Sequence, residues 1–285
     1  MPKPSANTRP PRRLIELFAV LESEVLFENS NVAVWRVSTN ELPNAALKFY
    51  KKGDKGNESD GFAFLSAAEG QYAAKVYDVV RDAALMEYLP GPSLGDLSRA
   101  QKDQQAAADL VEVANGLHAS KPISGSRTQT VEQWLNALLT IETTSEAATS
   151  DRAHFERARQ LAKDLLAAPE ELCFLHGDLH HDNIRKTAPG YCAFDAKGVL
   201  GERAYELANA FRNPKGVETL VRDPDRVRFL RDLWSREFAV APKRLMQWVC
   251  VKTALSISWR SGSRFSQDHE IDLLEIFFGI LDETE

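Results

Sequence analysis

A polar loop between two short apolar segments constrains this chain more than any other part of its sequence. The apolar segments are residues 172–175 and 191–194, and short apolar runs bounded by turn residues are typical of buried strands. The loop contains Asp178 and, five positions later, Asn183, while Asp195 directly follows the second segment. We therefore expect a short hairpin that brings two carboxylates and an amide to the same place.

These three side chains match the requirements of phosphoryl transfer. That reaction needs metal ligands near the phosphates, a carboxylate at the acceptor hydroxyl and a cation on the triphosphate. Mg²⁺ prefers hard oxygen ligands, which Asn183 and Asp195 can supply, and Asp178 can accept the hydroxyl proton. The protein-kinase catalytic loop has the same Asp-to-Asn spacing. The alternative is that Asp178 and Asn183 only form a turn and that Asp195 only caps a strand.

The hydrophobic periodicity changes along the chain. Residues 1–13 are basic and proline-rich and predict a disordered tail, and residues 14–26 predict an amphipathic helix. Strands are predicted within 28–50, 73–80 and 83–88, with a helix that starts near Glu58. After a breaker at 89–92, helices are expected over 101–120, 130–146, 152–168, 203–211, 224–238, 242–259 and 268–281. The pattern predicts an α+β fold, with a β-rich lobe over 14–90, a linker near 87–95 and a helical lobe over 91–285.

Composition excludes several classes of protein. The 285 residues suffice for one large domain or two lobes, and 44% hydrophobic with 27% charged residues is ordinary globular composition. A net charge of −6 argues against a general nucleic-acid-binding protein, which needs a basic face. No apolar run approaches the roughly 18–20 residues that cross a bilayer, so no membrane partner is expected. Three cysteines without a CxxC pair favour a reducing, cytoplasmic compartment.

The loop and its surroundings resemble the aminoglycoside phosphotransferase family, within the protein-kinase-like fold. Residues 176–183 match the family's H-G-D-x-x-x-x-N loop at every fixed position. Residues 194–209 and 244–259 are similar to the streptomycin 6-kinase and hydroxyurea-resistance kinase branch, which typically has I-D-P-K-G-x-x-G at the second metal ligand. Ala196 stands where the branch usually has proline, and Glu206 where it often has aspartate. Neither change removes an oxygen ligand or an acid, although the segment 27–32, which would cover the nucleotide, lacks glycine.

The resemblance implies a nucleotide site between two lobes, with ATP, or alternatively GTP, and Mg²⁺ as cofactors. Lys48 corresponds to the lysine that contacts the α/β-phosphates, and Glu58 to the glutamate that holds this lysine. The carbonyl of Glu87 and the amide of Leu89 correspond to the hinge groups that pair with the adenine edge. The alternatives are an ordinary lysine at a strand end and a glutamate favoured by the helix dipole.

Other polar residues near the loop have structural or open roles. His176, His180 and His181 do not form a zinc motif, because Gly177 stands where the H-E-x-x-H pattern needs glutamate. His176 is expected to organise the loop through hydrogen bonds. Lys197 either contacts the phosphates or pairs with an acid. Two residues of the following segment, Glu206 and Asn209, are expected to brace the loop.

The acceptor is predicted to be a small-molecule hydroxyl. Only about ten residues separate Asp195 from the segment 205–206, which leaves no room for a protein-kinase activation segment. The branch resemblance implies streptomycin or another aminoglycoside, and a cationic acceptor would favour acidic residues; the candidates by position are Glu132, Glu142, Asp268 and Glu270. Two alternatives remain: a housekeeping kinase for a small metabolite such as an amino alcohol or a sugar, and a nucleotide-binding module without catalysis. The sequence predicts no oligomeric state.

Overall fold

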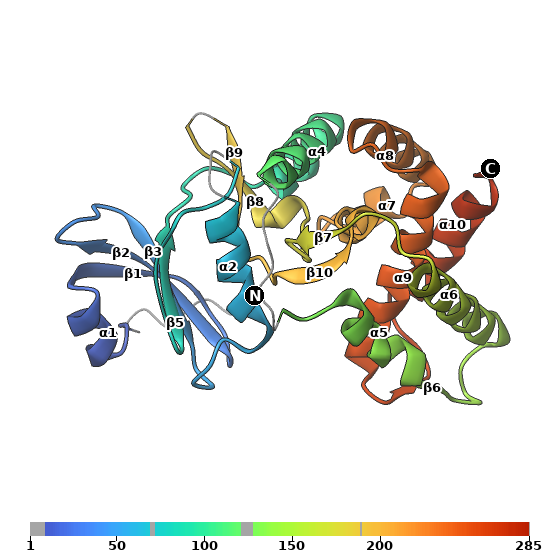
Figure 1. The fold of residues 1–285 in the computed structure, drawn as a ribbon, viewed down its shortest axis with the longest axis horizontal. Helices are drawn as coiled ribbons and strands as arrows, with labels where there is room; N and C mark the ends of the chain where they lie inside the picture. The colour runs from blue at the N-terminus through green and yellow to red at the C-terminus, as the bar shows by residue number, and fades with distance from the viewer. Residues whose placement is uncertain (1–8, 69–71, 121–127, 189, 285) are drawn as a thin grey trace.

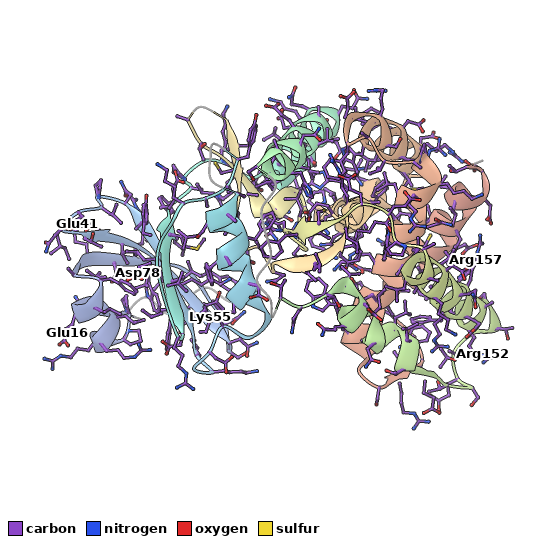
Figure 2. The ribbon with its side chains drawn as sticks, in the orientation of Figure 1. Glu16, Glu41, Lys55, Asp78, Arg152 and Arg157 are labelled. Atoms are coloured by element: carbon purple, nitrogen blue, oxygen red, sulfur yellow. The ribbon has the colours of Figure 1, made fainter. Side chains whose placement is uncertain are left out.

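The computed structural model describes residues 9–68, 72–120, 128–188 and 190–284. Figure 1 shows a β-rich lobe beside a helical lobe, which confirms the predicted α+β architecture. In Figure 2, Glu16 and Glu41 lie at the outer end of the β-rich lobe, and Arg152 and Arg157 extend from α6 (Thr149–Ala167) at the opposite end of the molecule. None of the helices in the described ranges has the length and apolar character needed to span a bilayer.

Five antiparallel strands form the sheet of the β-rich lobe, in the order β1-β2-β3-β5-β4. They are β1 (Val20–Glu28), β2 (Val32–Thr39), β3 (Ala45–Tyr50), β4 (Val76–Val80) and β5 (Ala83–Glu87). In β2, Ala33, Trp35 and Val37 are buried and alternate with more exposed neighbours, as a strand that covers a core requires. These side chains pack with Leu14 of α1 (Arg12–Leu17) in a small core of their own.

The opposite face of the sheet carries α2 (Ser59–Ala67), which follows the 3-10 turn η1 (Gly56–Glu58). Phe62 and Leu65 of α2 belong to the same large core as Tyr50 and Met86 of the sheet, and this core continues into the helical lobe. Figure 1 shows α2 between the sheet and the helical lobe. The helix therefore joins the two lobes through apolar contacts.

The predicted helix over 14–26 is wrong beyond α1. Ala19 has a positive φ of 49°, which ends the helix, and the chain continues as β1. This strand lies at the edge of the sheet, is mostly exposed and carries Glu22 and Glu24, as edge strands often do. The predicted disordered tail is also wrong at Arg12 and Arg13, which belong to α1, and residues 1–8 lie outside the described residues.

The helical lobe is built around α9 (Pro242–Ser261), which is buried along most of its length. The other helices described are α3 (Leu94–Arg99), α4 (Asp103–Ala119), α5 (Val131–Thr140), α6, α7 (Glu218–Val221), α8 (Pro224–Glu237) and α10 (Ile271–Asp282). Helices α5, α6, α8 and α10 all contact α9, which explains why α9 is buried over most of the stretch from Leu245 to Ser258. The indole nitrogen of Trp234 on α8 donates to the carbonyl of Ala107 on α4 at 2.9 Å and ties the outer helices together.

The expected hairpin between segments 172–175 and 191–194 is wrong. Strand β7 (Leu172–Leu175) pairs with β10 (Val199–Glu202), and β9 (Tyr191–Ala193) pairs with β8 (Ile184–Lys186). The loop after β7 is too long for a tight hairpin, and β8 forms within it and takes the partner that β7 was expected to have. A third pair, β6 (Glu142–Thr143) with β11 (Arg264–Phe265), is parallel.

Two predicted helices also differ from the structure. The helix over 130–146 ends at Thr140, and the helix over 203–211 is replaced by two 3-10 helices, η3 (Arg203–Tyr205) and η4 (Ala208–Arg212). Glu206 lies between η3 and η4, and its carboxylate accepts hydrogen bonds from the backbone after β7. The remaining predicted helices are present, with ends within a few residues of those expected.

The close contact between α2 and the segment after β9 gives a test of the lobe junction. A Cβ at Gly61 would lie 1.8 Å from the carbonyl oxygen of Ala196. We expect Gly61→Ala to lower the free energy of unfolding by about 1–3 kcal/mol, because helix and loop must move apart. Denaturant unfolding measures this, with Gly279→Ala as the matched control on α10, where an added Cβ meets no atom within 4 Å. The control should gain about 0.5–1 kcal/mol, and a similar gain at Gly61 would contradict the contact.

Candidate active site

The loop after β7 is organised by His176, as predicted from the sequence. Its side chain is fully buried and donates from Nε2 to the carbonyl of Phe194 at 3.0 Å. The backbone N–H of Asp178 donates to the other ring nitrogen, Nδ1, at 3.3 Å. Burial lowers the pKa of His176, so the ring is neutral and can donate at one nitrogen while it accepts at the other.

A buried carboxylate holds the start of the same loop through hydrogen bonds. Glu206 accepts hydrogen bonds from the backbone N–H groups of His176 at 2.9 Å and Gly177 at 3.0 Å. His118 of α4 donates from Nε2 to the same carboxylate at 3.0 Å. Burial alone would raise the pKa of Glu206, but the hydrogen bond from His118 and the backbone donors hold it below its ordinary value. Glu206 therefore braces the loop as an anion.

Asp178 is held at both its side chain and its backbone. Asn209 of η4 donates from Nδ2 to Oδ1 of Asp178 at 2.8 Å, and Arg212 donates to the amide oxygen of Asn209 at 2.9 Å. Asn183, at the end of the short 3-10 turn η2 (His181–Asn183), donates from Nδ2 to the carbonyl of Asp178 at 3.0 Å. The structure thus brings together the aspartate and the asparagine that the sequence singled out.

The segment that carries Asp195 is tied to this loop by backbone hydrogen bonds. The N–H of Phe194 donates to the carbonyl of Asn183 at 3.0 Å, and the N–H of Lys197 donates to the carbonyl of His176 at 2.8 Å. Asp195 itself has a positive φ of 61°, a rare conformation for a residue other than glycine. The strained turn directs its carboxylate toward the β-rich lobe, where Lys48 lies.

Four charged side chains meet between the lobes. The ammonium of Lys48 on β3 lies 2.5 Å from Oε2 of Glu58 and 2.5 Å from Oδ1 of Asp195. The ammonium of Lys197 lies 2.7 Å from Oε1 of Glu58 and 3.9 Å from Asp195. The hydroxyl of Tyr50 also donates to Glu58 at 2.5 Å. The predicted pairing of Lys48 with Glu58 is present, and Lys197 pairs with the same two acids.

This arrangement keeps both carboxylates ionised. Burial alone would raise the pKa of Asp195, yet the ammonium groups of Lys48 and Lys197 hold it well below its ordinary range. The pKa of Glu58 is lowered by the same two cations, against burial and the repulsion from Asp195. Two carboxylates and two ammonium groups therefore neutralise each other's charge at the junction of the lobes.

A cavity of about 590 Å³ lies next to these charges. Its lining includes Lys48, Glu58, Glu87, Leu89 and Asp195, five of the seven residues predicted to hold nucleotide, metal or acceptor. Asp178 and Asn183, on the neighbouring loop, are outside this lining. The end of β1, the turn after it and the start of β2 also line the cavity, through Leu26, Phe27, Asn29 and Val32. A segment without glycine thus covers the cavity, as the sequence predicted for residues 27–32.

The histidines of the loop do not form a metal site. Among the residues that the structure describes, Asp268, His269 and Glu270 are the group of possible ligands that lie within reach of one ion. Arg260 pairs with both of these carboxylates, and Arg212 also pairs with Glu270. Those carboxylates are therefore already neutralised by cations.

Of the acidic residues proposed for a cationic acceptor, none presents an unpaired carboxylate in a pocket. Glu132 and Glu142 are exposed, and Glu142 pairs with Arg264 at 3.3 Å. Two further residues were not predicted from the sequence: Arg212, which orients Asn209, and Lys252, a buried lysine on α9. The sequence signal for Lys252 was its place in the mainly apolar run 245–257, because lysine is rarely found within a buried run unless it has a partner.

A lysine held by a glutamate, facing a loop with the Asp-to-Asn spacing across a cavity between two lobes, is the arrangement of the protein-kinase-like phosphotransferases. The comparison with protein families agrees. The chain belongs to the aminoglycoside/hydroxyurea antibiotic resistance kinase family, whose model matches residues 19–263. The resemblance, the kinase-like fold and the assignment as a phosphotransferase with an alcohol group as acceptor are thereby confirmed.

Individual relatives agree with this assignment. The chain is 30% identical over 253 residues to a streptomycin 3″-kinase from Klebsiella pneumoniae. The matched region covers 87% of this chain and 91% of the relative. A choline/ethanolamine kinase family protein from Mesorhizobium loti has a TM-score of 0.65 at 14% identity, over 92% of this chain and 87% of that one. A ternary complex of a thermostable aminoglycoside phosphotransferase APH(4)-Ia mutant with AMP-PNP and hygromycin B has a TM-score of 0.63 at 16% identity, over 96% of both chains. The structural likenesses show the shared fold.

One substitution tests whether Glu206 stabilises the loop. In Glu206→Gln an amide nitrogen replaces one of the two oxygens that accept from His176, Gly177 and His118, so a buried donor loses its acceptor. We expect the free energy of unfolding to fall by about 1–3 kcal/mol. The control is Glu237→Gln, whose carboxylate pairs with Arg236 at the surface and which should change stability by less than about 0.5 kcal/mol. Equal effects in denaturant unfolding would show that Glu206 is not a brace.

Proposed function

We propose that this protein transfers the γ-phosphoryl group of ATP to a hydroxyl of an aminoglycoside such as streptomycin. The observation that carries the proposal is the placement of Asp178, fixed by Asn209, on a loop that is tied by backbone hydrogen bonds to the residues on either side of Asp195. Family membership and the streptomycin 3″-kinase relative support the choice of acceptor. The relative's name and the 6-kinase branch point to different hydroxyl groups, so the position of transfer is a separate question.

The nucleotide is proposed to occupy the cavity between the lobes. Lys48, held by Glu58, would contact the phosphates, and the carbonyl of Glu87 with the amide of Leu89 would pair with the adenine edge. Lys197 pairs with Glu58 at 2.7 Å, so it also keeps that carboxylate in place. ATP is the proposed donor, and the same assay with GTP decides whether guanine is accepted.

Mg²⁺ is the proposed metal, and the donor set fits it. Asn183 directs its amide nitrogen to the carbonyl of Asp178, which leaves the amide oxygen as a hard ligand. Asp195 supplies an ionised carboxylate, because Lys48 and Lys197 lower its pKa. Bound Mg²⁺ would neutralise the phosphate oxygens while Lys48 supplies a further cation.

Asp178 is proposed to receive the proton of the acceptor hydroxyl. Its hydrogen bond from Asn209 fixes one carboxylate oxygen, so the group has one orientation when the acceptor arrives. A nucleotide-binding module without catalysis would not require an aspartate held in this way. The proposed partner is a small-molecule acceptor and not a nucleic acid, and the proposed location is the cytoplasm.

Replacement of Asp178 tests the assigned base. We expect Asp178→Asn to lower kcat by about 10²–10⁴-fold, the range for a positioned general base, with nucleotide affinity nearly unchanged. The matched control is Asp182→Asn on the same loop, whose carboxylate pairs with Arg99 and which should retain most activity. Turnover by Asp178→Asn at the wild-type rate would remove Asp178 from the mechanism.

The acceptor class is tested in cells and in solution together. Expression in a streptomycin-sensitive host should raise the inhibitory concentration of streptomycin, and the Asp178→Asn variant should not. A parallel screen with labelled ATP covers aminoglycosides, amino alcohols and sugars. Phosphorylation of an amino alcohol or a sugar, with aminoglycosides left unmodified, would favour the housekeeping kinase instead.

A further inference from the structure

One lysine lies in the interior of the helical lobe, in contact with aromatic rings. Lys252 of α9 is 3% exposed. Its ammonium lies 4.8 Å from the centre of the Trp259 ring, 5.3 Å from that of Tyr205 and 5.6 Å from that of Trp134. We refer to these four residues as the lysine–aromatic cluster.

The ammonium of Lys252 lacks an acidic or hydrogen-bonding partner. With the residues that the structure describes it forms no hydrogen bond and no ion pair. Its charge instead contacts the three aromatic rings through cation–π interactions. Burial lowers the pKa of Lys252 to about 8, although the charge of Asp178 favours the protonated form. The group is therefore still charged at neutral pH. Cation–π contacts offset only part of the free-energy cost of a buried charge that has no anionic partner.

Two more donors beside Lys252 also lack acceptors. The hydroxyl of Tyr205 and the indole nitrogen of Trp248 are buried and have no hydrogen-bond partner among the described residues. Trp248 lies one turn before Lys252 on α9, and its ring packs against Tyr205 with a centroid distance of 5.4 Å. Buried polar groups are rarely left unsatisfied unless a ligand or water completes them. Both groups, like the ammonium of Lys252, are able to donate a hydrogen bond to an oxygen acceptor.

The cluster adjoins the loop that carries Asp178. A Cβ at Gly177 would lie 3.2 Å from the ring of Trp134, so this ring lies against the residue before Asp178. Trp134 and Trp259 pack edge to face, with ring centres 5.7 Å apart, and Trp259 is 46% exposed. The cluster thus extends from the neighbour of the proposed base to the surface of the protein.

We propose that the lysine–aromatic cluster is a subsite for the acceptor, in which Lys252 donates a hydrogen bond to a hydroxyl or carbonyl oxygen beside the reacting hydroxyl. The indole rings of Trp134 and Trp259 pack against the apolar face of the acceptor ring. This inference rests on the proposed function and adds the residues that bind the acceptor. The acceptor presents oxygen, not an ammonium group, toward Lys252, because two cations in one buried place repel each other.

The kinetic test uses a substitution that keeps the packing of the lysine stem. Lys252→Met retains the apolar length and removes the charge, so a purely structural role would leave catalysis intact. We expect the KM for the acceptor to rise by about 10-fold or more, with the KM for ATP within about 2-fold of the wild-type value. Lys252→Gln, which restores a donor, should recover part of the loss. Lys243→Gln, at an exposed position on the same helix, should change neither KM.

The selectivity test compares acceptors that differ only beside the phosphorylated hydroxyl. The wild-type enzyme should prefer the member of each pair with an oxygen there to the member with an amine, and Lys252→Met should reduce that preference. Unchanged acceptor KM and unchanged preference in a folded Lys252→Met protein would overturn the subsite. If no aminoglycoside is phosphorylated but another polyol is, with a KM that depends on Lys252, the proposed substrate fails and the subsite stands.

Discussion

The ion pairs among Lys48, Glu58, Asp195 and Lys197 are the interaction on which the rest of this structure depends. They join β3 and the start of α2 to the turn after β9, so the β-rich and helical lobes meet at one balanced group of charges. Buried charges are costly unless each has a partner, and here every carboxylate faces two ammonium groups. A triphosphate that enters the cavity would compete with Asp195 for Lys48. In the proposed function, the charge network would therefore link the contact between the lobes to nucleotide binding.

A second set of interactions fixes the loop that faces this network. Glu206 accepts from the backbone at the start of the loop, His176 bridges to Phe194, and Asn209 holds Asp178. His176 belongs to the loop itself, whereas Glu206 and Asn209 come from the segment of η3 and η4, and all three side chains are buried. The loop is thus prepared before substrate arrives, which reduces the cost of orienting reacting groups. The strained backbone at Asp195 is tolerated because hydrogen bonds on both sides hold that turn in place.

Much of the site could be predicted from the sequence, because spacing within one loop survives folding. The five-residue interval from Asp178 to Asn183 and the position of Asp195 after an apolar run identified the region that the structure brings together. The pairing of Lys48 with Glu58 followed from the family resemblance. Strand β1 was missed because an exposed edge strand carries no clear alternation, and the pairing of β7 was wrong because strand partners depend on the whole fold. Lys252 was missed because Trp134 and Tyr205, two of its aromatic contacts, lie far away in sequence, and periodicity does not report such contacts. Arg212 contacts Asn209 only three positions away, but its role depends on the hydrogen bond from Asn209 to Asp178, 31 positions away in sequence.

The central claim is that this chain moves a phosphoryl group to a hydroxyl of a small molecule and does not only bind or hydrolyse ATP. The most direct measurement incubates the purified protein with ATP, Mg²⁺ and streptomycin and follows ADP and the antibiotic together, by mass spectrometry and phosphorus NMR. The account predicts one phosphorylated streptomycin for each ADP formed, with the phosphate on a hydroxyl oxygen. ADP without a phosphorylated product, across streptomycin and the wider acceptor panel, would contradict it.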